Sequence, residues 1–261
     1  MKIFLFDMDG TLTPARKPME KSTMLALRDL QWAGYEIGIV TGSDMDYLVE
    51  QCDILFDLNG FKFHKAHYLP CNGTKYYKYG ESGKLETIYE NDMIKTIGEK
   101  SYRQLVSTCL NIQNHIVEST NCPLTGTFFD YRGSMLNWCP IGRSASKKER
   151  KTWVKIDKDS KVRLKWCSHL KSMLNQFGID NLTIKLGGET SFDIYPKGWD
   201  KTYCLKNFSD YSEINFVGDR CEENGNDQEI YSKVSKMKNC NAFKTNNPKM
   251  TVEIIKKFIN K

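Results

Sequence analysis

Short apolar runs alternate with stretches of helical periodicity near the start of the chain. The apolar runs Lys2–Asp7 and Glu36–Thr41 predict buried strands, because both are short and end in polar residues. Between them, Met19–Ala33 carries apolar residues at helical spacing. Another helix is expected at Met45–Cys52, followed by a short strand at Ile54–Phe56. This strand–helix–strand order predicts right-handed parallel crossovers.

After Asn72-Gly73 the pattern changes to that of hairpins and separate helices. The expected elements are a hairpin at Thr74–Ile88, a helix at Asp92–Gln113, a hairpin formed by Thr127–Tyr131 and Met135–Cys139, helices at Lys147–Trp153 and Ser160–Phe177, and strands at Thr183–Leu186 and Phe192–Tyr195. Paired strands mixed with helices are typical of an α+β domain. We therefore expect an inserted domain at about residues 81–193.

The α/β alternation returns at Asp200. The expected elements are a helix at Lys201–Asn207, a strand at Ile214–Gly218, a helix from about Asn226, a strand at Asn241–Lys244 and a last helix after Pro248. The predicted fold class is therefore α/β, a Rossmann-like core with a parallel sheet formed by residues 1–80 and 194–261. The α+β insert at 81–193 would be its cap.

Composition narrows the class of protein. The chain has 261 residues, of which 40% are hydrophobic and 27% charged, as in an ordinary soluble globular protein. No apolar run approaches the roughly 20 residues that a membrane span needs, and no secretory signal is evident. The nine cysteines include no CxxC pair, so we expect reduced thiols in a cytoplasmic protein without a membrane partner.

The net charge of +6 has two explanations. One is an anionic small substrate, and the other is nucleic-acid binding. The sharpest basic cluster, Lys147–Lys151, is interrupted by Glu149, so no Lys/Arg run is dense enough to require a nucleic-acid partner. We therefore expect no nucleic acid to bind.

The strongest candidate chemistry follows the first strand, where Asp7 and Asp9 stand two residues apart. Open α/β sheets bind ligands at the carboxyl ends of their strands, and residues i and i+2 share a face. Paired carboxylates call for a cation, and hard oxygens suit Mg²⁺. The pair is typical of a nucleophile, Asp7, and a general acid/base, Asp9, for phosphoryl transfer. The Thr11 hydroxyl could orient Asp9 or cap a turn.

The same residues carry a resemblance. Asp7–Thr11 is similar to the DxDGT signature of the haloacid dehalogenase (HAD) superfamily, in which the first Asp is phosphorylated and the second moves protons. By position, Thr41-Gly42-Ser43 resembles the second, phosphate-binding motif, although Ser43 or Asp44 could be an ordinary helix cap. Lys201 resembles the third motif.

The fourth superfamily motif matches Val217-Gly218-Asp219. The resemblance implies a Mg²⁺ ion bound by Asp7, the backbone carbonyl of Asp9 and Asp219. Asn226 and Asp227 stand where partners of these ligands, or further ligands, belong.

The cap narrows the resemblance to the eukaryotic phosphomannomutases. The segments that carry it are Phe6–Thr13 with Arg16, Tyr131–Asn137, Pro140–Ser144, Glu149-Arg150, Gly187–Asp193 and Gly198–Leu205. In that family the matching residues bind hexose phosphate, which implies substrate contacts for Arg16, Arg132, Arg143, Arg150, Ser191 and Asp193. Arginine suits bidentate phosphate recognition.

The resemblance implies reversible conversion of mannose 6-phosphate and mannose 1-phosphate for GDP-mannose synthesis. Phospho-Asp7 would give its phosphoryl group to a hexose monophosphate, with hexose 1,6-bisphosphate as intermediate and activator. A homodimer through the cap is a further family-level expectation. The alternative is a Mg²⁺-dependent HAD sugar-phosphate phosphatase, in which water attacks phospho-Asp7.

Overall fold

The computed structural model describes residues 1–56, 63, 65–223 and 225–260. The chain forms two compact units, one made of Met1–Glu90 and Trp199–Lys261 and the other of Asn91–Gly198. The second unit is thus inserted in the sequence of the first.

The first unit is built on a seven-stranded sheet in the order β11-β10-β1-β2-β3-β4-β5. Its strands are β1 (Lys2–Phe6), β2 (Glu36–Val40), β3 (Ala66–Leu69), β4 (Lys75–Tyr79), β5 (Leu85–Glu90), β10 (Glu213–Gly218) and β11 (Asn241–Lys244). The pairs from β11 to β3 are parallel, whereas β4 and β5 are antiparallel additions at one edge. The predicted α/β fold class is confirmed.

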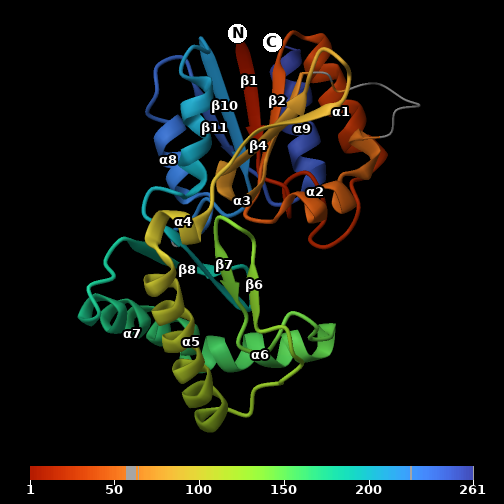
Figure 1. Cartoon of the computed structure of the whole chain (residues 1–261). Helices are drawn as coiled ribbons and strands as arrows, with labels where there is room; N and C mark the ends of the chain where they lie inside the picture. The colour runs from red at the N-terminus through yellow and green to blue at the C-terminus, as the bar shows by residue number, and fades with distance from the viewer. Residues whose placement is uncertain (57–62, 64, 224, 261) are drawn as a thin grey trace. The chain divides into compact units, whose positions relative to one another are not determined.

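Helices cover both faces of this sheet (Figure 1). One face carries α1 (Lys21–Trp32), α2 (Met45–Gln51) and α9 (Pro248–Ile259), and the other carries the 3₁₀ helix η2 (Lys201–Phe208) and α8 (Gln228–Val234). Two short helices, η1 (Asp53–Leu55) and α3 (Pro70–Gly73), follow α2 and β3. Strands covered on both faces have apolar side chains at every position.

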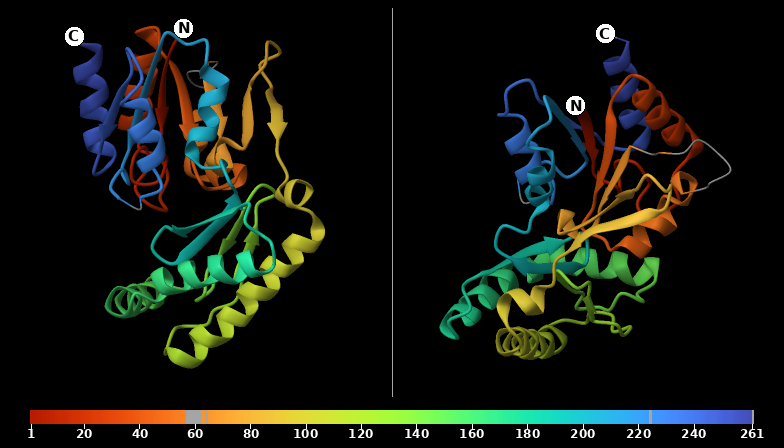
Figure 2. Two further views of the ribbon diagram at one scale, coloured as in Figure 1. Left: turned by 90° about the vertical axis from the view of Figure 1, so that its left-hand side faces the viewer. Right: turned by 45° about the horizontal axis from the view of Figure 1, so that its top comes forward.

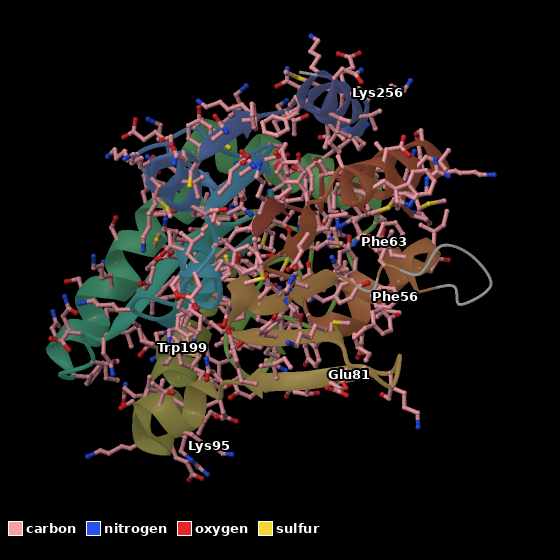
Figure 3. All side chains as sticks on the ribbon, turned by 90° about the horizontal axis from the view of Figure 1, so that it is seen from above. Phe56, Phe63, Glu81, Lys95, Trp199 and Lys256 are labelled. Atoms are coloured by element: carbon pink, nitrogen blue, oxygen red, sulfur yellow. The ribbon has the colours of Figure 1, made fainter. Side chains whose placement is uncertain are left out.

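The strand β1 illustrates this arrangement. Ile3 and Leu5 belong to the cluster beneath η2 and α8, while Phe4 and Phe6 belong to the cluster beneath α1 and α9. All four side chains are fully buried. Phe56 and Phe63, labelled in Figure 3, also pack on the second of these clusters.

The inserted unit has a four-stranded antiparallel sheet in the order β6-β7-β9-β8. Its elements are α4 (Met93–Ile97), α5 (Glu99–Ser119), β6 (Phe129–Tyr131), β7 (Leu136–Trp138), α6 (Lys147–Ser160), α7 (Val162–Gln176), β8 (Leu182–Gly187) and β9 (Ser191–Pro196). Figure 2 shows α5 and α7 on the same face of the sheet. There Trp138 stacks on Phe192, and its indole nitrogen donates to Gln113 of α5 at 2.9 Å.

The strand register of the inserted unit aligns one row of polar residues. Asp130 pairs with Asn137, Asn137 with Asp193, and Asp193 with Lys185. Because side chains alternate between faces, this row lies on the face opposite Trp138 and Phe192. The inserted unit therefore has one apolar face under its helices and one polar face.

Two sequence-based expectations about elements are wrong. Ile54–Phe56 is not a strand, because the 3₁₀ helix η1 occupies Asp53–Leu55, and the third strand is Ala66–Leu69. The helix expected at Asp92–Gln113 is interrupted at Gly98, where φ is +84°, and continues to Ser119. The short helix expected at Lys201–Asn207 is confirmed as the 3₁₀ helix η2.

The unit boundaries also differ from the expected ones. A boundary at residue 80 would cut the β4–β5 hairpin, whose turn includes Glu81 in Figure 3. A boundary after Asp193 would cut β9, which pairs along its whole length with β8. Among the described residues, no helix has the length and apolarity to cross a membrane.

Candidate active site

The candidate site of the first unit lies where three neighbouring parallel strands end. Asp7 follows β1, Thr41 follows β2 and Asp219 follows β10. Parallel strands present their carboxyl ends at one edge of the sheet, where open α/β folds bind ligands. Carboxylate oxygens of Asp7, Asp219 and Asp227 lie within 4.8 Å of one another.

Lys201 is the cation within this acidic group. Its ammonium donates to Asp7 Oδ1 and, at 2.6 Å, to Asp227 Oδ1, and only 1% of its side chain is exposed. Asp200 holds the start of η2 by accepting from the Thr202 backbone N–H at 2.8 Å. That cap fixes the backbone next to Lys201 and so directs its side chain.

The acidic group carries more negative charge than one lysine can balance. Burial, the repulsion from Asp227 and that from Asp219 raise the pKa of Asp7 well above its ordinary value, against the pull of Lys201. Burial and Asp227 likewise raise the pKa of Asp219 to about 6. Burial lowers the pKa of Lys201, but Asp227 and Asp7 raise it by more, so the amine stays protonated.

This donor set fits a divalent cation. Three carboxylates with hard oxygens converge, and the raised pKa values of Asp7 and Asp219 record repulsion that a cation would relieve. Asp227 is fully buried and contributes directly to the group, while Asn226 is exposed. The sequence placed both residues around the metal ligands, and Asp227 joins the acidic group.

Gly10 allows the turn after β1 to pass close to Asp219. Its φ is +85°, and a β carbon there would lie 2.3 Å from Asp219 Oδ2. The turn is closed by the Gly10 N–H, which donates to the Thr13 carbonyl at 2.7 Å. A larger residue would be strained and would displace the carboxylate.

Asp9 is held by neighbours that the sequence did not predict. Its Oδ1 accepts from the Tyr47 hydroxyl at 3.1 Å and from the Arg16 backbone N–H at 3.2 Å. Burial and the charge of Asp9 raise the pKa of Tyr47, which keeps the phenol protonated as a donor. The Thr11 hydroxyl, which could have oriented Asp9 or capped a turn, is buried and has no hydrogen-bond partner among the described residues.

The loop after β2 is braced from within. Thr41 is buried, and its hydroxyl accepts from the Ser43 N–H at 3.1 Å. The helix cap is Asp44, which accepts from the Tyr47 N–H at 2.9 Å. Asp44, rather than Ser43, is therefore the N-cap of α2.

A second loop, after β3, packs on the first. Cys71 and Asn72 both have positive φ, and their N–H groups donate to the carbonyls of Ser43 and Thr41 at 2.8 and 2.7 Å. The Asn72 amide donates to the Trp199 carbonyl at 3.3 Å. Asn72 thus joins the loop after β2 to the segment that leads into Lys201.

The polar face of the inserted unit holds the predicted arginines. Arg132 Nε donates to Asp130 Oδ2 at 3.0 Å, and Arg143 Nε lies 3.4 Å from the same oxygen. Arg143 Nη1 donates to Asn137 Oδ1 at 3.1 Å, and Asn137 Nδ2 donates to Asp193 Oδ1 at 2.6 Å. We call these five residues the arginine network.

Arg150 is attached to this network through the Arg143 backbone, whereas Ser191 contacts Arg163. Arg150 donates to the Arg143 carbonyl and to the Thr190 hydroxyl, both at 3.0 Å. The Ser191 carbonyl accepts from buried Arg163 at 3.0 Å. Five of the six predicted substrate residues therefore lie in the inserted unit, and Arg16, exposed, lies in the first.

Comparison with known proteins decides the family. The model of the eukaryotic phosphomannomutase family matches residues 24–261. A phosphomannomutase of Arabidopsis thaliana is 36% identical over 88% of this chain and 86% of its own. One of Schizosaccharomyces pombe is 33% identical over 99% of this chain and 94% of its own. The chain belongs to the eukaryotic phosphomannomutase family.

Solved structures show the same fold at low sequence identity. An IMP-bound, N-terminally truncated IMP-nucleotidase of Plasmodium falciparum matches with a TM-score of 0.67 at 12% identity, covering 100% of this chain and 68% of that one. The C-terminal domain of trehalose-6-phosphate phosphatase from C. albicans matches with a TM-score of 0.61 at 14% identity, covering 99% and 92%. The HAD-like fold class is thereby confirmed.

In this member of the phosphomannomutase family, several residues around the site escaped sequence reasoning. They are Tyr47, Asn72, Asp130, Asn137 and Arg163. Only the strand pairing of Asp130 with Asn137 offered a signal, since both stand in the middle of a predicted hairpin. The other contacts join segments far apart in the sequence, which periodicity does not reveal.

Proposed function

We propose that this member of the phosphomannomutase family interconverts mannose 6-phosphate and mannose 1-phosphate with Asp7 as the phosphorylated nucleophile. The observation that carries the proposal is the buried pair of Asp7 and Lys201 beside Asp219 and Asp227. A carboxylate held by an ammonium at a strand end has the position and charge balance that an aspartyl-phosphate needs.

In the first step phospho-Asp7 gives its phosphoryl group to the sugar. The bond between Asp7 Oδ and phosphorus breaks, and a bond forms between that phosphorus and a hydroxyl oxygen of the hexose monophosphate. The hydroxyl proton passes to Asp9, and the product is hexose 1,6-bisphosphate. In the second step a bond forms between Asp7 Oδ and the other phosphorus, the bond between that phosphorus and its sugar oxygen breaks, and Asp9 returns the proton to that oxygen.

Asp9 can do both tasks because its carboxylate is held from two sides. The Tyr47 hydroxyl and the Arg16 N–H fix Oδ1, which leaves Oδ2 for the proton. Asp7 and Asp219, the proposed ligands of Mg²⁺ with the Asp9 carbonyl, would hold the ion next to the transferring group. Bound there, Mg²⁺ supplies positive charge to phosphoryl oxygens.

The phosphate-binding roles follow from donors near each strand end. Lys201 would neutralise the transferring phosphoryl group, and the loop Thr41-Gly42-Ser43 would offer it the hydroxyl groups of Thr41 and Ser43. In the inserted unit, we assign the phosphate not being transferred to the guanidinium groups of Arg132, Arg143 and Arg150.

The remaining substrate assignments concern the sugar. Ser191 and Asp193 would accept hydrogen bonds from its hydroxyls, and Arg16 would contact the substrate from the first unit. We also propose hexose 1,6-bisphosphate as activator, a homodimer through the inserted unit, and a cytoplasmic enzyme that supplies GDP-mannose synthesis. None of the nine cysteines, all of which are described, forms a disulfide.

One incubation tests the reaction. The protein is mixed with mannose 1-phosphate, Mg²⁺ and a catalytic amount of hexose 1,6-bisphosphate, and both mannose 6-phosphate and free phosphate are measured. We expect mannose 6-phosphate in excess of phosphate. Stoichiometric phosphate without mannose 6-phosphate would instead support the alternative, a sugar-phosphate phosphatase. That alternative is favoured by the fold alone, which this chain shares with phosphatases.

A further inference from the structure

Two arginines of the network share a single carboxylate oxygen. Arg132 Nε and Arg143 Nε lie 3.0 and 3.4 Å from Asp130 Oδ2. The Arg132 side chain is 7% exposed, whereas Asp130 and Arg143 are 26% and 33% exposed. Solvent and small anions can therefore reach the carboxylate and one of its two guanidinium partners.

The strand register fixes Asp130 in this position. Asp130 on β6 stands opposite Asn137 on β7, and Asn137 is oriented by its bond to Asp193 on β9. Arg143 is tied to the same row through Asn137 Oδ1, and its carbonyl accepts from Arg150. The carboxylate is thus part of a rigid sheet, while the guanidinium groups reach it on longer side chains.

At the shared oxygen one carboxylate faces two guanidinium groups, while the network's other carboxylate, Asp193, accepts from Asn137. The donors of both guanidinium groups therefore converge on the place of a single anionic oxygen. A phosphate dianion carries more charge and more acceptor oxygens than the Asp130 carboxylate, and guanidinium binds it in the same planar geometry. Phosphate and Asp130 are therefore competitors for the same N–H donors.

We propose that Asp130 is a positioning residue that holds Arg132 and Arg143 together and is displaced from them by the phosphate of a bound hexose phosphate. The inference rests on the proposed function, because the mutase cycle requires each phosphate to be bound and then released. When the Asp130 carboxylate binds the guanidinium groups again, it replaces the phosphate and speeds its release. Asp130 therefore weakens phosphate binding and raises turnover.

Three substitutions separate the charge of Asp130 from its geometry. Asp130→Asn keeps the shape and one acceptor oxygen but removes the competing charge, so inorganic phosphate should bind about three- to tenfold more tightly. Half-saturation by mannose 1-phosphate should fall in the same variant, and turnover should fall with it. Asp130→Ala also removes the acceptor, so its phosphate affinity should be below that of Asp130→Asn. Asp130→Glu, which keeps the charge, should stay near the wild type.

Phosphate binding is measured on the full chain by titrating inorganic phosphate and following the Nε–Hε NMR signals of its arginines. In the wild type the Arg132 and Arg143 signals should both move as the carboxylate is exchanged for phosphate. The control signal is Arg28, whose Nε donates to Asp29 Oδ1 at 3.1 Å in the first unit and which has no proposed phosphate contact, so it should not move. Asp180→Asn, which removes an exposed charge from the same unit, should bind phosphate as the wild type does.

The outcomes decide the proposal separately from the reaction. Phosphate binding by Asp130→Asn that equals or falls below that of the wild type would overturn it. Equal phosphate binding by Asp130→Asn and Asp130→Ala would overturn the positioning role. Arg132 and Arg143 NMR signals that do not move in the wild type would also overturn it. This second test needs no variant, so it holds even if every variant fails to fold. A wild type without mutase activity whose two signals move would contradict the proposed function and leave the role of Asp130 standing.

Discussion

In the first unit three carboxylates surround one buried lysine, whereas in the inserted unit two arginines surround one carboxylate. The side chains of Lys201 and Asp7 are 1% and 5% exposed, and those of Asp130 and Arg143 are 26% and 33% exposed. Breaking a buried ion pair is costly because it leaves a charge without a partner, while half-exposed pairs contribute little. The buried group therefore suits a fixed reaction centre, and the exposed network suits an anion that must come and go.

The largest expected effect is that of Asp7→Asn. Because the substitution removes the proposed nucleophile, mutase turnover should fall by more than about 10³-fold. The fold should remain intact, since Asp227 still holds Lys201 and repulsion within the acidic group decreases. Turnover and the circular dichroism spectrum of the same preparation test both statements. Mutase activity retained by this variant would refute the nucleophile assignment.

A smaller effect, on stability, is expected for Lys201→Met. It leaves Asp7, Asp219 and Asp227 without their buried cation, so the free energy of unfolding should decrease by about 3 kcal/mol in EDTA. Mg²⁺ should restore part of this loss if the same carboxylates bind it. Chemical denaturation with EDTA and with Mg²⁺ measures both. The matched control is Lys206→Met, in the same helix but exposed, and equal losses in the two variants would contradict the role of the buried pair.

In the inserted unit, Arg143→Ala should act on binding rather than on stability. Half-saturation by mannose 1-phosphate should rise about tenfold or more, because a guanidinium partner of the phosphate is lost. The free energy of unfolding should change by less than about 1 kcal/mol, since the ion pair is half-exposed. Steady-state kinetics and thermal melting separate the two. An unchanged half-saturation would count against a phosphate contact by Arg143.

The acidic group of the first unit and the arginine network of the inserted unit also differ in how far the sequence predicted them. Asp7, Thr41 and Asp219 each follow an apolar strand directly, and parallel strands bring their ends together, so local pattern was enough to join them. The third strand was missed because Ala66–Leu69 includes the polar His67. The imidazole is buried, and its two ring nitrogens form hydrogen bonds with Glu36 and the Tyr76 hydroxyl, at 2.8 and 2.7 Å.

The network of the inserted unit depends on a different kind of information. Its arginines were found through resemblance, but their common partner Asp130 was not, since Arg143 lies outside the paired strands β6 and β7 and the strand pattern does not reveal its contact with Asp130. Asn226 was placed near the metal ligands, and its side chain is exposed. Strand register and turn geometry fix these details, and neither is written in the spacing of one sequence.

The smallest expected effect is a pH dependence confined to the acidic group. The pKa of Asp219 is raised from 3.8 to about 6, so between these values the folded protein keeps a proton that the unfolded chain has lost. In EDTA, this group's contribution to stability therefore falls as the pH rises through that window. The melting temperature should be a few degrees lower at pH 7 than at pH 5.

Mg²⁺ binds the deprotonated carboxylate, so its stabilising effect should be larger at pH 7. Asp219→Asn should flatten the pH dependence and Arg143→Ala should leave it unchanged. If the melting temperature changed with pH equally in the wild type and in Asp219→Asn, the acidic group would not be the source of the pH dependence.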